Sequence, residues 1–206
     1  MRHYIKAVLH KEEGAEDPQE SYDGFMIYGT DVLEYPQRYS DIKEFLAQTD
    51  KNKVRATLGL GSPVEILNGV LAGIDIFESD YPLTQASLGH ALQIQKIEEG
   101  KSECTISDIQ LSKLLETKQQ HCINLNKEEF KESKEPLVKG CQCYTCKNYN
   151  RAYLYHMLEV KEMNANILIA IHNVAQFDLL FSQIRDNVKS IGAFIQDYAQ
   201  LNCIDK

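Results

Sequence analysis

Short apolar runs alternate with segments of helical periodicity along the first part of the chain. The runs at 22–29, 54–61 and 74–79 predict buried strands. Between them, 39–50 and 62–73 carry apolar residues at the i, i+3, i+4 spacing of an amphipathic helix. Strands and helices in this order predict parallel βαβ units, in which functional residues usually follow the strand ends.

Helix start and stop signals support both of these helices. Ser40 is the candidate N-cap of the first. The second has Ser62 at its N-cap, Pro63 at the first helical position, Glu65 three residues after the cap and Gly73 just beyond its end.

The chain changes character after these units. Residues 95–135 are charged and rich in loop formers, with one predicted helix at 107–120. From Arg151 onward the period is strongly helical, which predicts two or three helices with breaks near Asn164 to Asn166. No internal repeat is visible.

Composition narrows the class of protein. The 206 residues are 43% hydrophobic, which is enough for one sizeable core. No run approaches the roughly 18 apolar residues of a membrane span, and the N-terminus lacks the features of a signal or transit peptide. The net charge of -8 argues against strong independent binding to a phosphate backbone.

Cysteine use is uneven. Cys104, Cys122 and Cys203 are scattered, and we interpret them as buried or tolerated thiols. The stretch GCQCYTC at 140–146 places the other three within six positions. Six cysteines in a chain without an export signal do not suggest a disulfide framework.

The close cysteines and a later histidine favour a metal site. Cys141, Cys143, Cys146 and His172 have the spacing C-x-C-x-x-C-x25-H, and three thiolates with one imidazole form the closed tetrahedral set of structural zinc sites. The alternatives are idle thiols with a core histidine, or a redox pair of Cys143 and Cys146. We favour zinc because redox pairs begin a helix after a strand in a thioredoxin-like unit, and the sequence predicts no such unit.

Several motifs in register resemble one enzyme family. They are GFMIYG, LGLGSPVEILNGVLAGIDIFES, the short INL, PLVKGCQCYTC with its C-x25-H spacing, and RAYLYHML. Together they are similar to the tRNA-guanine transglycosylases, or queuine tRNA-ribosyltransferases. The resemblance implies an α/β fold, the C-terminal half of a (βα)8 TIM-type barrel with a zinc-binding, helical C-terminal subdomain. We therefore expect a partial barrel at 1–135 and a zinc subdomain with the C-terminal helices at 136–206.

Departures from the family pattern bear on catalysis. Where catalytic members have a nucleophilic aspartate after a barrel strand, this chain has Glu78, followed by Ser79 in place of a cysteine. Thr84 replaces an arginine, and Tyr28 replaces a glycine that lets the backbone approach a flat base. A nucleophile shifted by about 1 Å can cost about a hundredfold in rate. Asp75 is expected to be structural.

These departures resemble the family's accessory, non-catalytic subunits. The resemblance implies a subunit of a heterodimer that exchanges guanine for queuine at the wobble position of tRNAs with GUN anticodons, with no catalysis by this chain alone. The alternative is a divergent transglycosylase with Glu78 or Asp80 as nucleophile. A stand-alone zinc-binding interaction module is disfavoured, because the βαβ units would be superfluous to it.

The resemblance also implies partners and a location. One structural Zn²⁺ per chain would support an interface with a catalytic subunit, or with a second copy, and Tyr153 and His156 match the family's interface cluster. Lys139, Lys147 and Arg151 could contact tRNA phosphates within the complex, although a solvated charged face is the commoner meaning. The expected location is the cytoplasm, with peripheral association at the mitochondrial outer membrane as an option and no transmembrane segment.

Overall fold

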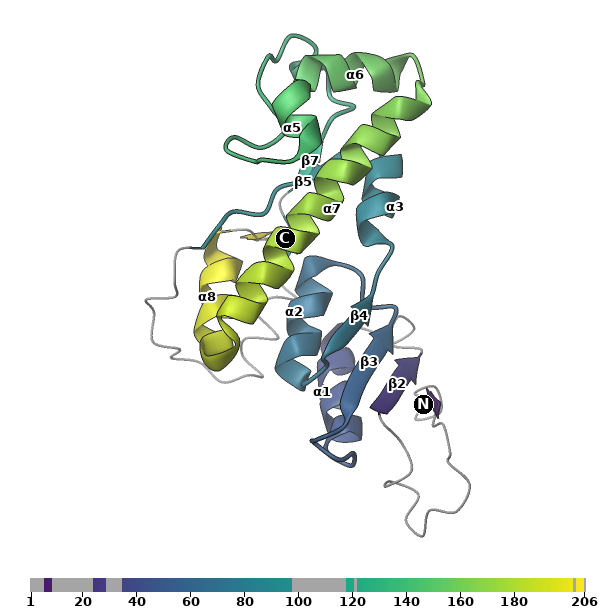
Figure 1. Ribbon diagram of the computed structural model, residues 1–206, viewed down its shortest axis with the longest axis vertical. Helices are drawn as coiled ribbons and strands as arrows, with labels where there is room; N and C mark the ends of the chain where they lie inside the picture. The colour runs from purple at the N-terminus through teal and green to yellow at the C-terminus, as the bar shows by residue number, and fades with distance from the viewer. Residues whose placement is uncertain are drawn as a thin grey trace. The chain divides into compact units, whose positions relative to one another are not determined.

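Figure 1 shows the computed structural model, which describes residues 6–8, 24–28, 35–97, 118–120, 122–201 and 203–205. Contacts divide the chain into two compact units. The first comprises Met1–Ser79 and Cys104–Lys118, and the second comprises Asp80–Glu103 and Gln119–Lys206. Each unit is described by itself below.

The first unit is built on a four-stranded sheet in the order β1-β2-β3-β4. Its elements are β1 (Lys6–Val8), β2 (Gly24–Tyr28), α1 (Tyr35–Leu46), β3 (Val54–Leu58), α2 (Pro63–Ala72) and β4 (Ile76–Glu78). Strand β1 pairs antiparallel with β2, whereas β2, β3 and β4 are parallel neighbours. The parallel βαβ units predicted from the sequence are therefore confirmed, although the described residues form an open sheet and not a barrel.

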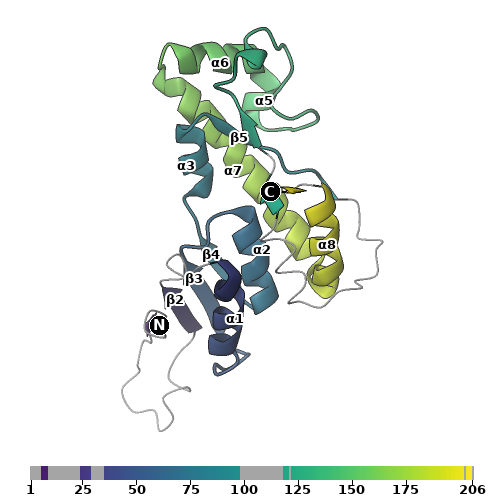
Figure 2. The same ribbon diagram turned by 180° about the vertical axis from the view of Figure 1, so that it is seen from behind.

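The core of this unit lies between the sheet and its two helices. Figures 1 and 2 show α1 and α2 covering the same face of the strands. Ile27 from β2 packs there with Tyr39, Ile42 and Leu46 from α1, and Phe77 of β4 lies against the same cluster. Because side chains alternate along a strand, the residues at the other positions of the strands face away from this core.

The start of α2 agrees with its sequence signals. The Ser62 hydroxyl accepts a hydrogen bond from the Glu65 N–H at 3.3 Å, and the Glu65 carboxylate accepts one from the Ser62 N–H at 2.8 Å. This reciprocal pair is a capping box. Gly73 ends the helix with φ of 102°, in the left-handed region that favours glycine.

The start of α1 differs from the prediction. The helix begins at Tyr35, so Ser40 lies inside it and the prediction that Ser40 is the N-cap was wrong. The reason is that Pro36 is compatible with the first turn of a helix, where its missing N–H costs no hydrogen bond.

The second unit is mainly helical. Its elements are α3 (Tyr81–Ser87), β5 (His90–Leu92), β6 (Lys118–Gln120), β7 (Cys122–Asn124), η2 (Glu128–Phe130), α5 (Tyr144–Asn148), α6 (Arg151–Glu159), α7 (Met163–Asp186), η3 (Val188–Ser190), α8 (Ile191–Leu201) and β8 (Cys203–Asp205). β5 pairs antiparallel with β7, and β6 pairs with β8. In Figure 1, α7 is the long helix of this unit, with α3 beside it and α5 and α6 toward its N-terminal end.

Two predictions for this part of the chain need adjustment. Residues 118–120 form a strand, so the helix predicted at 107–120 does not extend to its proposed end, and the rest of that segment lies outside the described residues. The predicted helix break near Asn164 to Asn166 falls instead at 160–162, because Lys161 adopts a positive φ of 57°. The asparagines occupy the first turn of α7, where their short polar side chains are tolerated.

The residues that make up the second unit also differ from the domain 136–206 that we expected. Residues 80–97 are grouped with the C-terminal helices. The physical reason is that β5 pairs with β7, while α3 and β5 both pack on α7.

Within the described residues, α7 is long and apolar enough to cross a membrane by length and composition. The expectation that no stretch approaches a membrane span is corrected to that extent. Half of its most apolar window is buried inside the protein, as in the core helix of a folded domain, so the match is weak evidence.

Candidate metal centre

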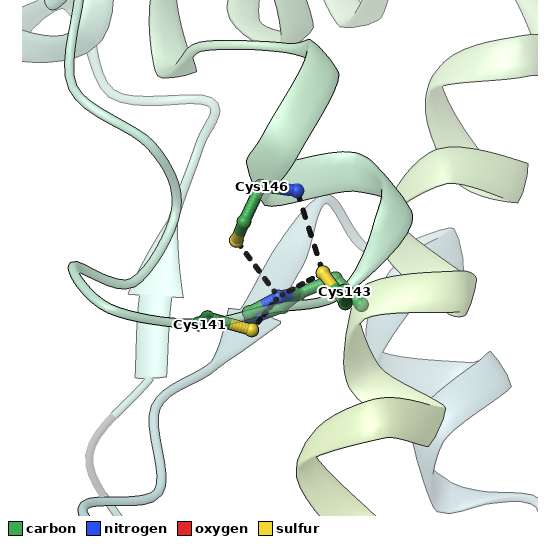
Figure 3. Close-up of side chains that lie close together, drawn as sticks. Cys141, Cys143 and Cys146 are labelled. Carbon is green, nitrogen blue, oxygen red and sulfur yellow. Dashed lines mark hydrogen bonds between the residues drawn. The ribbon is translucent and has the colours of Figure 1, made fainter.

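The four predicted metal ligands come from a loop, a short helix and the long helix α7. Cys141 lies in the loop, where its N–H donates to the Val138 carbonyl at 3.2 Å. Cys143 is the N-cap of α5, and its sulfur accepts a hydrogen bond from the Cys146 N–H at 3.4 Å. Figure 3 shows the three labelled cysteines facing a common centre.

The distances around this centre match a tetrahedral metal site. His172 Nδ1 lies 3.8 Å from the sulfur of Cys141 and 3.4 Å from the sulfurs of both Cys143 and Cys146. All four candidate ligand atoms lie within 4.8 Å of one another. Zinc bonds of about 2.3 Å to sulfur and about 2.0 Å to nitrogen at a tetrahedral angle would separate sulfur from nitrogen by roughly 3.5 Å.

The orientation of His172 is fixed by its other ring nitrogen. The side chain is buried, and Nε2 lies 2.8 Å from the Leu92 carbonyl oxygen. A carbonyl can only accept a hydrogen bond, so Nε2 carries a proton, and Nδ1 is the ring nitrogen that faces the three sulfurs and would bind a metal. Metal-ligating histidines commonly have such a partner.

The electrostatics of the cluster favour a bound cation. Burial alone would lower the pKa of His172, but hydrogen bonds with Cys141, Cys143 and Cys146 raise that pKa to about 11. Burial raises the pKa of the Cys141 thiol, whereas its hydrogen bond with His172 and lesser contacts lower that pKa to about 6. Without metal, the cluster therefore favours thiolate beside imidazolium, and a divalent cation would take over the positive charge.

The cysteine loop is also attached to α7 without a metal. The Thr145 hydroxyl, fully buried, donates to the Leu168 carbonyl at 2.6 Å. Cys146 and Tyr149 pack against the core cluster that contains Leu168. The redox alternative is disfavoured because α5 follows a loop and not a strand, and because the sulfurs of Cys143 and Cys146 both lie against His172.

Comparison with known proteins places this geometry in a family. The family model for queuine tRNA-ribosyltransferase matches residues 9–201. The chain belongs to the queuine tRNA-ribosyltransferase family. Relatives include accessory subunit 2 from Danio rerio, 30% identical over 81% of this chain and 44% of the relative, and from Homo sapiens, 32% identical over 70% and 39%. A queuine tRNA-ribosyltransferase from Thermosipho africanus is 33% identical over 82% of this chain and 40% of its own length.

This family member thus spans about two fifths of the length of these relatives. The family is of the TIM-barrel type, which agrees with the parallel strands β2, β3 and β4. Proteins named as accessory subunits and proteins named as the transferase itself both match.

The sequence analysis did not predict one part of the site in this family member. Three buried amide side chains of α7, those of Asn173, Gln176 and Gln183, bind the backbone of residues 90–97. Their oxygens accept from the N–H groups of Leu92 at 2.8 Å, Ile94 at 2.8 Å and Ile97 at 2.6 Å, respectively. The available signal was that polar residues at 172, 173, 176 and 183 lie on one side of an otherwise apolar helix.

The amides take the place of a neighbouring strand. β7 lies on one edge of β5, and the side chains of α7 satisfy the backbone on the other edge. Asn173 also donates to the carbonyls of Pro82 and His90, each at 3.0 Å. Side chains of α7 therefore form hydrogen bonds both with the metal-ligand cluster and with the backbone of residues 82–97.

The predicted interface residues lie on one exposed face of α6. Tyr153 and His156 are both exposed, whereas Leu154 is fully buried. The Tyr153 ring stacks on Tyr149, with centroids 5.1 Å apart, and Tyr149 meets Tyr144 edge-on at 6.0 Å. The sequence analysis missed this tyrosine chain, because Tyr149 lies before the start of α6 and the turn between α5 and α6 brings its ring to Tyr153.

The predicted basic patch is smaller than expected. Lys139 and Lys147 are exposed. Arg151 donates to the Glu135 carboxylate at 3.2 Å and to the Leu137 carbonyl at 2.9 Å, and it lies over the Phe130 ring. Arg151 therefore holds the preceding loop to α6 and is less available to a phosphate.

Glu78, at the position of the family nucleophile, belongs to the first unit, whereas Asp80 and the four metal ligands belong to the second. Glu78 ends β4 and is exposed, and it is paired in register with Leu58 of β3. Tyr28 ends β2, while Asp80 precedes α3. Asp75 accepts a hydrogen bond from the Arg55 N–H at 3.0 Å, which supports its expected structural role.

Proposed function

We propose that this chain acts within a non-catalytic subunit of the heterodimeric queuine tRNA-ribosyltransferase. This complex would exchange guanine for queuine at the wobble position of tRNAs with GUN anticodons. The observation that carries the proposal is the glutamate at position 78, in a chain similar to proteins named accessory subunit 2.

The surroundings of Glu78 support a non-catalytic role. Its carboxylate is exposed, and among the described residues it forms no hydrogen bond or ion pair. A carboxylate nucleophile needs near-attack placement, which neighbouring groups normally supply. Tyr28, at the end of a strand in the same sheet, adds a phenol where the family pattern has glycine.

A catalytic role is the second candidate, because proteins named as the transferase also match this chain. Glu78 or Asp80 would then be the nucleophile. One measurement distinguishes the two candidate functions: incorporation of radiolabelled guanine or queuine into tRNA by the purified chain. We expect none above a no-protein control. Incorporation that is abolished by Glu78→Gln would support the catalytic candidate instead.

Zinc at the centre would be structural. Three cysteines and one histidine fill a tetrahedral shell and leave no position for a reacting water. The chemistry supplied by the metal is neutralisation of the thiolates and cross-linking of the loop at 141–146 to α7, so its binding energy would contribute to folding.

The proposed interface with the catalytic subunit centres on Tyr153 and His156. Tyr153 is 45% exposed and is held by its stack on Tyr149. A large aromatic ring that is ordered before binding loses little entropy on association and commonly carries about 2 kcal/mol or more at the centre of an interface.

The interface is tested by affinity measurement with a catalytic subunit. The double change Tyr153→Ala with His156→Ala should weaken binding at least about thirtyfold, and zinc content should stay the same. The matched control, Val188→Ala with Lys189→Ala, removes two exposed side chains beyond the other end of α7, a helix about 36 Å long. Equal binding by wild type and the Tyr153 double variant would place the interface elsewhere.

The proposed location rests on the family resemblance. We propose the cytoplasm, with peripheral attachment at the outer mitochondrial membrane. Fractionation with a carbonate wash tests it, since a peripheral protein is released by the wash and a membrane-spanning one is retained.

A further inference from the structure

The side chain of Gln176 contacts both a metal ligand and the backbone of residue 94. Its Oε1 accepts a hydrogen bond from the Ile94 N–H at 2.8 Å. Its Nε2 points to the sulfur of Cys141 at 3.5 Å. The residue is 2% exposed, and its bond to Ile94 is buried, so water does not compete for that bond.

The first bond determines the second. An amide has one acceptor end and one donor end, and a backbone N–H can only be met by the oxygen. With the oxygen fixed by Ile94, the NH₂ group of Gln176 must face Cys141. A buried side chain with both ends bonded loses the freedom to turn away.

A donor at this position suits the charge of the centre. Three thiolates around one divalent cation carry a net charge of -1, and the site is screened from water on the α7 side. An N–H directed at a thiolate is a charge-assisted hydrogen bond, which is stronger than a neutral one. The residues that surround metal ligands commonly change metal affinity by about tenfold to a hundredfold.

We propose that Gln176 is a positioning residue for the metal centre. It orients the Cys141 thiolate and links it to residues 90–97. This proposal rests on the metal centre proposed above and adds a contribution from a side chain that is not a ligand. Together with the bond from His172 to Leu92, it connects two of the four ligands to alternate residues of one extended segment.

Gln183 provides a matched control on the same helix. It is 5% exposed, and its oxygen accepts from the Ile97 N–H at 2.6 Å, while its NH₂ group faces the Gln95 carbonyl at 3.5 Å. It therefore makes the same kind of backbone contact as Gln176, seven residues further along α7, but its NH₂ group meets a carbonyl instead of a metal ligand.

The test compares glutamate and methionine variants of both residues in the full chain. Gln176→Glu keeps an oxygen for Ile94 but replaces the donor to Cys141 with a negative charge. Gln176→Met is uncharged and removes both bonds, which provides a second variant should the buried charge prevent folding. Zinc affinity is measured by competition with a chromophoric chelator at pH 8, and cobalt-substituted protein reports on the sulfur ligands through its thiolate-to-metal absorption band.

We expect both Gln176 variants to bind zinc about tenfold to a hundredfold more weakly than wild type and to shift the cobalt band. The Gln183 variants should stay within about threefold of wild type, with an unshifted band. Equal affinities for the Gln176 variants and wild type would overturn the proposal, as would equal losses in the Gln176 and Gln183 variants, because the effect would then be general destabilisation. Wild type that binds neither zinc nor cobalt would refute the metal centre itself.

Discussion

Asn173 offers a sharp test of the hydrogen-bond network on α7. Its side chain is fully buried and makes three hydrogen bonds, with the Leu92 N–H at 2.8 Å and with the Pro82 and His90 carbonyls at 3.0 Å each. The change Asn173→Ala removes all three and leaves these backbone groups without their partner.

The expected loss of stability follows from that count. A buried polar group left unpaired costs about 1–3 kcal/mol, and the groups of Leu92 and Pro82 meet Asn173 in fully buried bonds. Alanine recovers roughly 0.6 kcal/mol through its higher helix propensity. For these two groups the net loss is therefore about 1.4–5.4 kcal/mol, which for a chain of this size lowers the melting temperature by about 3–20 °C.

The assay is thermal unfolding of zinc-loaded protein followed by circular dichroism. Asn166→Ala is the matched control, because Asn166 lies exposed on the same helix and the change removes the same side chain. This control should leave the melting temperature unchanged or slightly higher. If Asn173→Ala and Asn166→Ala shift it equally, the network contributes nothing measurable and our reasoning about residues 82–97 is wrong.

Three further outcomes are expected. Wild type purified without chelator should hold about one zinc by elemental analysis, and Cys143→Ser should hold less than a tenth of an equivalent; equal contents would contradict the four-ligand site. In metal-free, reduced protein, both Cys141 and His172 contribute to the free energy of unfolding through their shifted pKa values. Because the pKa of Cys141 is lowered, its contribution is lost as pH falls through about 6. Because the pKa of His172 is raised, its contribution is lost as pH rises through about 11. Melting temperatures measured across this range should therefore be highest between those limits, and a steady rise or fall would argue against the pairing. Ser62→Ala should lower the free energy of unfolding in urea by about 1 kcal/mol, because it removes the cap hydrogen bond from the Glu65 N–H. An unchanged urea midpoint would show that this cap does not stabilise the fold.

Local features of the fold could be predicted from the sequence because the interacting groups are close in the chain. The capping box of Ser62 and Glu65 spans three residues, and the sequence carries all of its signals. The three cysteines share a loop and one turn of helix, so their spacing alone indicated a common target. The order of strands and helices in the first unit followed from periodicity in the same way.

Other local predictions failed where one residue's backbone conformation decided the outcome. The break before α7 depends on the positive φ of Lys161, which nothing in the composition of that segment signals. The start of α1 lies before Pro36 and not at Ser40, because two acceptable start signals lie within five residues and the sequence does not rank them.

The hydrogen bonds around the metal centre could not be predicted from the sequence, because the tertiary structure selects their partners. Asn173 and Gln176 meet backbone groups that lie 81 and 82 residues earlier in the chain. The sequence shows that these amides share the side of α7 that carries His172, but a buried amide can pair with any backbone group that the fold brings to it. Only the packing of residues 90–97 along α7 selects Leu92 and Ile94 as partners, and that packing is what directs Gln176 to Cys141 and His172 to the three sulfurs.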